Sequence, residues 1–273
     1  MPTITARDGT PIHVNDWGTG RTIVLVHGWP LSSEMWEYNA IPLAEQGFRV
    51  VSYDRRGFGR SGKPYTGYDY DTMTDDLAAV FDELDLSDAV LVGFSMGGGE
   101  VARYMTRHQG RGVGKAVLVS SVVPYLLKGP DNPDGVDQSV FDEFVEGLRA
   151  DRPNFLHDFG KAFYGAGLLN FSLSAPFLDW TQGLALQASP KATLDCVRAF
   201  SATDFRPDTK NFRVPTLVIH GSGDKTVPLE VSGQRAHEMI AGSELVVYEG
   251  AAHGLHYTER DRLNADLARF ARG

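Results

Sequence analysis

A serine flanked by glycines is the first place where this sequence could carry out chemistry. The apolar run 89–92 leads into the G-F-S-M-G pattern of residues 93–97, and a stretch with helical character follows. A G-x-S-x-G pattern between a strand and a helix holds its serine on a sharp turn, at a helix N-terminus whose free N–H groups face negative charge. Ser95 is therefore a candidate nucleophile for acyl transfer. Taken alone, the pattern also fits an ordinary glycine-rich turn with an exposed serine.

A serine hydroxyl needs a base to take its proton and an acid to orient that base. Asp224 follows the apolar run 215–220, and His253 follows the run 244–248, each in a short glycine-rich loop. Parallel strands bring their carboxyl ends to one edge of a sheet, and the chain order Ser, Asp, His is the one that this kind of elbow uses. Ser95, Asp224 and His253 are thus predicted to form a catalytic triad.

Both partners of the serine have rival interpretations. Asp224 could be an exposed loop residue, because Asp and Gly are common in turns. His256 is the nearest rival of His253, but it lies within the start of the last predicted helix. The other histidines are interpreted as structural: His13, His27, His108, His157, His220 and His237.

Acyl transfer also needs N–H donors aimed at the tetrahedral oxyanion. The residue after the nucleophile, Met96, supplies one of them. Trp29, in the loop after the apolar run 22–26, is the candidate for the second. Because Pro30 follows it, the backbone of Trp29 is restricted to extended conformations. Trp29 could equally be an aromatic anchor of the loop, and the two roles are compatible.

An alternation of strands and helices would position these residues. Apolar runs predict strands at 3–6, 11–17, 22–26, 48–53, 89–92, 115–120, 215–220 and 244–248, the first two as a hairpin. Helical periodicity predicts helices after the elbow and at 71–84, 229–240 and 259–270, with Asp71 as the N-cap of the first of these three. The predicted fold class is α/β, with a mostly parallel central sheet flanked by helices.

The alternation fails between residues 122 and 212. This stretch is rich in proline and aromatic residues and contains helix-like pieces such as 140–148. We therefore expect an α/β core made of residues 1–121 and 213–273, with 122–212 inserted as a helical cap over the sheet.

Composition narrows the class of protein. A net charge of −9 without a lysine or arginine run argues against nucleic acid as a partner. The single Cys196 excludes an internal disulfide, and neither a signal peptide nor an apolar stretch long enough for a membrane is visible, so a cytoplasmic location is expected. Residues 57–63 imitate glycine-rich nucleotide loops, but Pro64 stands where a magnesium-binding hydroxyl is required.

The chain resembles the α/β-hydrolase fold family and, within it, the bacterial arylesterases and cofactor-free haloperoxidases. The resemblance covers essentially the whole length. It rests on six blocks in the expected order: residues 27–31 (HGWPL), 53–61 (YDRRGFGRS), 93–100 (GFSMGGGE), 204–208 (DFRPD), 220–224 (HGSGD) and 252–254 (AHG).

The resemblance implies the triad Ser95, Asp224 and His253, the oxyanion donors Trp29 and Met96, and no metal or cofactor. It implies hydrolysis of small carboxylic and aryl esters through an acyl-serine. A second implied activity converts a carboxylic acid and hydrogen peroxide into a peracid that oxidises halide. Pro30 resembles the haloperoxidase branch, because a proline there changes where the Trp29 carbonyl points, and that carbonyl can accept a hydrogen bond from peroxide. Related enzymes are often homo-oligomers.

Four side chains besides Trp29 stand where related enzymes bind substrate: Phe144, Phe159, Phe163 and Val227. Each could instead be a packing residue. Ser95 argues against relatives that carry aspartate at the elbow, whereas lactonases, C–C bond hydrolases and proline iminopeptidases remain alternatives. A non-catalytic ligand-binding protein on the same scaffold is also conceivable, although it would not need the complete triad and both oxyanion positions.

Overall fold

The fold is built on one central sheet. The computed structural model describes residues 3–167 and 173–273, and within them eight strands pair in the order β1-β2-β4-β3-β5-β6-β7-β8. Strands β3 to β8 run parallel, whereas β1 and β2 are antiparallel to their neighbours. The predicted fold class, including the hairpin, is confirmed. The strands are β1 (Thr3–Thr5), β2 (Pro11–Trp17), β3 (Thr22–Val26), β4 (Arg49–Tyr53), β5 (Ala89–Phe94), β6 (Val113–Val119), β7 (Thr216–Gly221) and β8 (Glu244–Tyr248).

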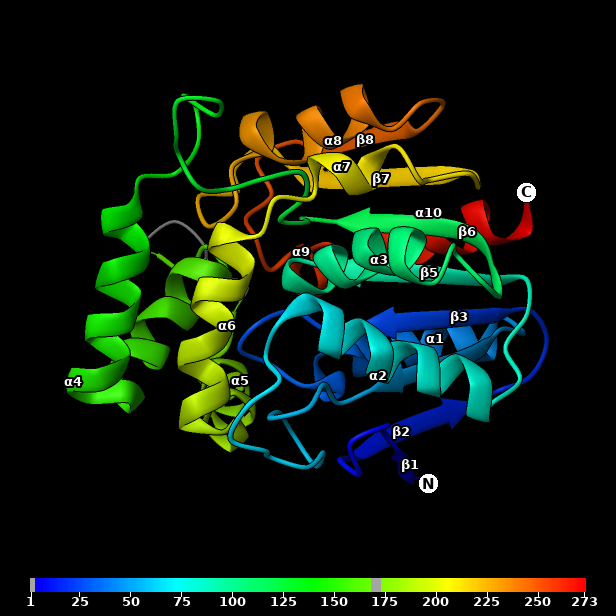
Figure 1. Ribbon diagram of the computed structural model, residues 1–273, viewed down its shortest axis with the longest axis horizontal. Coiled ribbons are helices and arrows are strands. Elements are labelled where there is room, and N and C mark those ends of the chain that lie inside the picture. The colour runs from blue at the N-terminus through cyan, green and yellow to red at the C-terminus, as the bar shows by residue number, and fades with distance from the viewer. Residues whose placement is uncertain (1–2, 168–172) are drawn as a thin grey trace.

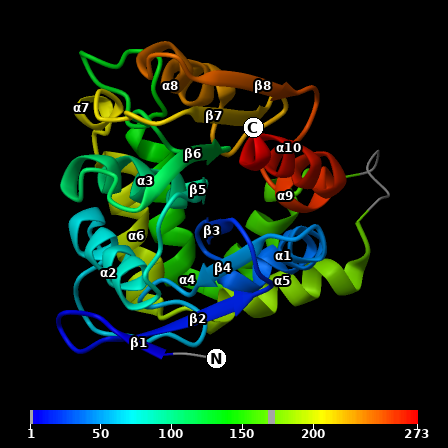
Figure 2. The same ribbon diagram turned by 90° about the vertical axis from the view of Figure 1, so that its right-hand side faces the viewer.

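Helices cover both faces of the sheet, which explains the continuous apolar strands. Figures 1 and 2 show α2 and α3 on one face and α1 and α10 on the other. Every residue of β3 and β5 is buried, as expected for strands covered on both faces. The helices are η1 (Ser33–Trp36), α1 (Glu37–Glu45), α2 (Tyr70–Glu83), α3 (Met96–Arg107), α4 (Gln138–Phe163), α5 (Ala175–Gln187), α6 (Pro190–Ala202), α7 (Arg206–Thr209), η2 (Leu229–Val231), α8 (Gly233–Met239), α9 (Leu255–Thr258) and α10 (Arg260–Arg272).

The N-cap predicted for the helix at 71–84 is wrong. The cap of α2 is Asp69, whose extended backbone lets its side chain accept a hydrogen bond from the Thr72 N–H at 2.9 Å. Asp71 lies within the first turn and pairs with Arg103 instead. Both aspartates suit a helix start, so the sequence alone did not distinguish them.

One helix predicted as continuous is divided. The stretch 229–240 breaks at Ser232 (φ −131°, ψ −89°), whose hydroxyl donates to the Pro228 carbonyl at 2.5 Å. Such a local side-chain bond offers the backbone an alternative to the helix. At the C-terminal end, His256 lies on the separate short helix α9 rather than on α10.

Helices α4, α5 and α6 stand at one edge of the sheet. Figure 1 shows them at the edge toward which the arrowheads of β3 and β6 point. This placement supports the proposal that residues 122–212 form an inserted cap, and the boundaries of that segment remain a prediction. Residues 168–172 of the segment lie outside the described part of the chain.

Helix α4 bends near its middle. The backbone of Asp151 is non-helical (φ −153°, ψ 85°), and its Oδ1 accepts a hydrogen bond from the Asn154 N–H at 3.0 Å. Pro153 consequently falls in a first turn, where its missing N–H has no consequence. The second half carries three aromatic rings at a spacing of four residues: Phe155, Phe159 and Phe163. The piece predicted at 140–148 is only the first half of this helix.

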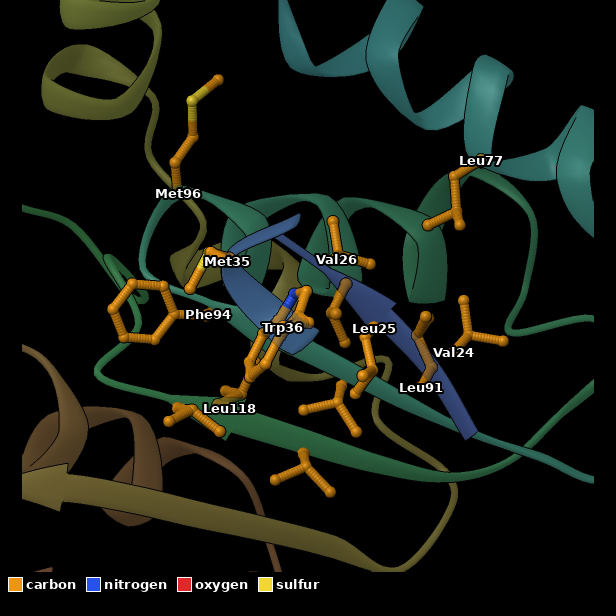
Figure 3. Close-up of a cluster of buried hydrophobic side chains, with 14 of the residues drawn as sticks. Val24, Leu25, Val26, Met35, Trp36, Leu77, Leu91, Phe94, Met96 and Leu118 are labelled. Atoms are coloured by element: carbon orange, nitrogen blue, oxygen red, sulfur yellow. The ribbon is translucent and has the colours of Figure 1, made fainter. Parts of the chain in front are cut away.

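The apolar core reaches directly under the carboxyl end of β5. Figure 3 shows Trp36 beside side chains of β3, with Phe94 on its other side, and the Trp36 and Phe94 rings meet edge to face with centroids 6.1 Å apart. The Phe94 ring also lies 5.0 Å from the ring of His253. The residue before the predicted nucleophile is therefore fixed by packing on both sides.

A buried ion pair joins the loop after β4 to α3. Arg55 and Glu100 are both inaccessible to solvent, and Arg55 Nε donates to Glu100 Oε1 at 2.5 Å. The hydroxyl of Tyr53 donates to the other carboxylate oxygen at 2.6 Å. The guanidinium also donates to the His27 carbonyl at 2.6 Å. The pair therefore connects the helix that follows Ser95 to the loop that carries Trp29.

Replacing Glu100 with alanine should lower the free energy of unfolding by about 3–5 kcal/mol, because the Arg55 charge would stay buried without its partner. Denaturant unfolding of the purified variant measures this loss. The matched control is Glu244→Ala, which removes the partner of Arg269 in a pair whose side chains are about half exposed. That loss should stay below about 1 kcal/mol. Equal losses in the two variants would contradict the structural role of the buried pair.

Candidate active site

Ser95 occupies a sharp turn between β5 and α3. Its backbone lies at φ 54° and ψ −121°, a conformation that L-residues rarely adopt. The turn also brings backbone segments into close approach. A Cβ atom at Gly93 would lie 2.5 Å from the Gly97 carbonyl oxygen, and one at Gly97 would lie 2.6 Å from the Val26 carbonyl oxygen. The glycines of the motif are therefore required by contact between the two elements and the neighbouring strand.

The structure brings the three residues of the predicted triad into one hydrogen-bonded chain. His253 Nε2 lies 2.9 Å from Ser95 Oγ, and His253 Nδ1 lies 2.6 Å from Asp224 Oδ2. All three side chains are buried. The carboxylate oxygen can only accept, so Nδ1 carries the proton and Nε2 offers its lone pair to the serine hydroxyl.

Asp224 is fixed by its own turn. Its Oδ1 accepts hydrogen bonds from the N–H groups of Thr226 at 2.9 Å and Val227 at 2.8 Å. Burial alone would raise the pKa of Asp224, but the charge of His253 and hydrogen bonds from His220 and His253 hold it well below its usual value. The group is therefore a carboxylate at any pH near neutrality, as an acid that orients a histidine must be.

Both predicted oxyanion donors are free to donate. Met96 is the first residue of α3, so its N–H has no acceptor within the helix. Along the described chain, the Trp29 N–H donates to no other group. The peptide that carries it is held through its carbonyl, because the Gly28 oxygen accepts from the Leu31 N–H at 3.1 Å and from His27 Nδ1 at 2.9 Å.

His27 sits beneath this loop in one tautomer. Its Nε2 accepts a hydrogen bond from the Arg55 N–H at 2.9 Å, which leaves Nδ1 to donate to Gly28. Burial and the neighbouring Arg55 charge lower the pKa of His27 to about 3. The ring therefore stays neutral, and its interpretation as a structural histidine agrees with these contacts.

A small apolar cavity lies against the serine. Its volume is about 30 Å³, roughly two water-sized spheres. Its walls are Trp29, Ser95, Val122, Leu126, Val136, Val140, Phe141, Phe144, Phe159, Phe200, Thr226, Val227 and His253. We call this space the inner cavity.

Most of the predicted substrate-binding residues meet at this cavity. Trp29, Phe144, Phe159 and Val227 line it, and the Trp29 and Phe159 rings meet edge to face with centroids 5.2 Å apart. Phe163 does not. Its ring packs edge to face against His253 at 4.7 Å and lines a second small cavity beside Pro30 and Leu31.

An open cleft adjoins the inner cavity. It has a volume of about 1410 Å³ and lies between α4 and the loops after β7 and β8. Neither Ser95 nor His253 lines it, but five residues form walls of both spaces: Val136, Val140, Phe144, Phe159 and Thr226. We call this space the outer cleft, and it shares these walls with the inner cavity.

The two histidines nearest to the predicted triad differ in their surroundings. His256 is enclosed by aromatic rings, and burial and the charge of His253 lower its pKa to about 3. It has no contact with Ser95 or Asp224. His220 was interpreted as structural, yet its Nε2 lies 3.4 Å from Asp224 Oδ2. Its place at the end of β7, four residues before Asp224, was the signal that could have linked the two.

The geometry agrees with the comparisons with known proteins. The family model described as alpha/beta hydrolase fold matches residues 21–260. The chain belongs to the α/β-hydrolase fold family. It is 43% identical to a non-heme chloroperoxidase of Streptomyces lividans and 41% identical to a bifunctional esterase/perhydrolase of Acinetobacter calcoaceticus, over 100% of both chains in each pair. A crystal structure of bromoperoxidase from Bacillus anthracis matches with a TM-score of 0.96 and 44% identity, also over 100% of both chains.

The predicted resemblance to haloperoxidases and esterases within the family is thereby confirmed. Along residues 3–167 and 173–273, no helix is long and apolar enough to cross a membrane. The same described residues contain no group of three or more His, Cys, Asp or Glu side chains arranged to hold a metal ion.

Proposed function

We propose that this protein is a serine hydrolase that acts on small carboxylic and aryl esters through an acyl-serine, with perhydrolase and cofactor-free haloperoxidase activity. The observation that carries the proposal is the hydrogen-bonded chain from Ser95 Oγ through His253 to Asp224. The names of the related esterase/perhydrolase and haloperoxidases support both activities.

In the first half of the reaction, Ser95 Oγ attacks the ester carbonyl carbon while His253 Nε2 takes its proton. The oxyanion of the tetrahedral intermediate accepts hydrogen bonds from the N–H groups of Met96 and Trp29. Asp224 keeps the ring of His253 oriented and stabilises its positive charge. The C–O bond then breaks, the alcohol leaves with the proton from His253, and the acyl group stays on Ser95.

In the second half, His253 takes a proton from water or hydrogen peroxide, and the resulting oxygen nucleophile attacks the acyl carbon. The bond between that carbon and Ser95 Oγ then breaks, and His253 returns the proton to Oγ. Water releases the carboxylic acid, and hydrogen peroxide releases a peracid. Outside the site, the peracid transfers one oxygen atom to bromide, so that bromide is oxidised to hypobromite and the peracid returns to the carboxylic acid. Within the described residues the Trp29 carbonyl accepts no hydrogen bond, so it is free to accept one from peroxide.

The two spaces at the site favour particular esters. The inner cavity takes only a few non-hydrogen atoms, so the acyl group is short, of the size of acetate or propionate. The outer cleft shares walls with it and is far larger, so it accommodates the alcohol or aryl part of the ester. An apolar inner wall with only Ser95, Thr226 and His253 as polar members suits an unsubstituted acyl chain.

Replacing Ser95 with alanine should reduce p-nitrophenyl acetate hydrolysis by about 10⁴-fold or more, because no other group forms the acyl-enzyme. Bromination in acetate, hydrogen peroxide and bromide should be lost in parallel. The control is Ser222→Ala. In the unaltered protein the Ser222 hydroxyl donates to Glu249 in an exposed loop at the same edge of the sheet. Serine-independent bromination would contradict a shared acyl-enzyme, and serine-independent ester hydrolysis would contradict the proposed function.

Replacing Phe159 with alanine should lengthen the preferred acyl chain, because this ring separates the inner cavity from both neighbouring spaces. The ratio of kcat/KM for p-nitrophenyl hexanoate to that for the acetate should rise by about tenfold. The control is Phe155→Ala, one turn earlier on α4, where the ring lines the outer cleft but not the inner cavity. An unchanged ratio at Phe159, or an equal rise at Phe155, would contradict this account of acyl selection.

Replacing Pro30 with leucine should favour hydrolysis over perhydrolysis, because the Trp29 carbonyl would lose the direction that proline gives it. The ratio of peracid to carboxylic acid formed from one acyl-enzyme should fall by about tenfold. This change corresponds to the loss of one hydrogen bond of ~1.4 kcal/mol. The measurement is peracid against acetate formed from the same ester, with hydrolysis without peroxide as the internal control. An unchanged ratio of peracid to acetate would contradict a role of Pro30 in perhydrolysis.

A further inference from the structure

A second histidine faces the carboxylate of Asp224. His220 is the second-to-last residue of the buried strand β7 and is inaccessible to solvent. Its Nε2 lies 2.8 Å from the Val227 carbonyl oxygen and 3.4 Å from Asp224 Oδ2. Both neighbours are hydrogen-bond acceptors, so Nε2 must carry the proton.

The ring of His220 is held in place from its other side. In the described part of the chain, Nδ1 has no hydrogen-bond partner. It faces Gly233, the first residue of α8, where a Cβ atom would lie 2.5 Å from Nδ1. The absence of a side chain at Gly233 lets the imidazole pack against the start of the helix. Packing therefore fixes the direction in which Nε2–H points.

Val227 connects this histidine to two parts of the site. Its N–H donates to Asp224 Oδ1, its carbonyl accepts from His220, and its side chain lines the inner cavity. The Asp224 carboxylate is thus surrounded by two turn N–H groups at Oδ1 and by two histidines at Oδ2. His220 closes the ring of contacts that sets the position of the carboxylate.

We propose that His220 is a positioning residue, which shares its Nε2–H between the Val227 carbonyl and the Asp224 carboxylate and so keeps Oδ2 aimed at His253. The proposal rests on the proposed function, because it takes Asp224 and His253 as the acid and base of the reaction. His220 itself touches neither Ser95 nor the inner cavity.

Three titratable groups bear on this arrangement. Asp224 lies in the loop after β7, next to His220. His253 faces Asp224 from the loop after β8, and His256 faces His253 from α9. On helix α8, Gly233 lies against the His220 ring and carries no titratable group. Because His256 stays neutral with its low pKa, it adds no charge between pH 5 and pH 9. A change in the acid limb of the pH profile therefore reports on the pair Asp224 and His253.

The test uses two amides that differ only in reach. His220→Gln can place an N–H near the position of Nε2, whereas His220→Asn is too short to do so. The control is Ser232→Ala, which removes a hydrogen bond to the Pro228 carbonyl in the same loop without touching Asp224. The first measurement is the proton NMR signal of the short His253 Nδ1–H bond, which lies at low field and needs no turnover.

The asparagine variant should shift or broaden this signal, and the glutamine variant should restore it, while Ser232→Ala should leave it unchanged. In ester hydrolysis, kcat of the asparagine variant should fall by about tenfold. Its acid limb should move to higher pH by about half a unit, because a carboxylate with one donor fewer holds the proton of His253 more strongly.

An unchanged signal in His220→Asn would overturn the inference, as would equal changes in Ser232→Ala. A changed signal with an unmoved pH profile would reduce His220 to a structural support of the turn and would also overturn it. Absence of Ser95-dependent hydrolysis in the unaltered protein would instead refute the proposed function. The NMR comparison still decides the role of His220 in that case.

Discussion

The backbone of Ser95 is the constraint on which the rest of the site depends. Holding a non-glycine residue at φ 54° and ψ −121° costs of order 1–3 kcal/mol, which the surrounding structure must offset. Close contact of Gly93 with Gly97, and of Gly97 with β3, leaves the turn no room to relax. The ion pair of Arg55 and Glu100 then ties α3 to the neighbouring loop. The hydroxyl is thus held above the sheet edge before any substrate arrives.

Groups far apart in the chain complete the site because parallel strands end together. His253 is 158 residues from Ser95, yet their side chains lie 2.9 Å apart. Because these side chains are buried, the hydrogen bonds between them are stronger than they would be in water, where electrostatic interactions are screened. The same burial would destabilise the Asp224 carboxylate if its donors were missing. The turn at 224–227 and the histidines around it therefore act as one electrostatic unit.

From the sequence, the fold and the candidate catalytic residues could be predicted more accurately than the packing of individual side chains. A motif that requires a particular backbone conformation, such as the elbow around Ser95, can be recognised from its residue types alone. The loops that carry Asp224 and His253 could be predicted because the parallel strands before them end at the same edge of the sheet. The N-cap at Asp69 and the break at Ser232 depend on single side-chain bonds that periodicity does not register. Phe163 was assigned to the pocket by resemblance, but its ring packs against His253 and lines a different cavity. The contact of His220 with Asp224 required three-dimensional distances.

The walls of the inner cavity and the proposed reactive groups come largely from separate segments of the chain. The residues proposed as triad and oxyanion donors lie outside residues 122–212, whereas eight walls of the cavity lie within them: Val122, Leu126, Val136, Val140, Phe141, Phe144, Phe159 and Phe200. Most of the cavity wall can therefore change without altering the proposed reactive groups, whereas Trp29, Ser95 and His253 belong to both sets. A lineage with this architecture can explore new esters by drift in one stretch of the gene while selection preserves the reactive groups in the other.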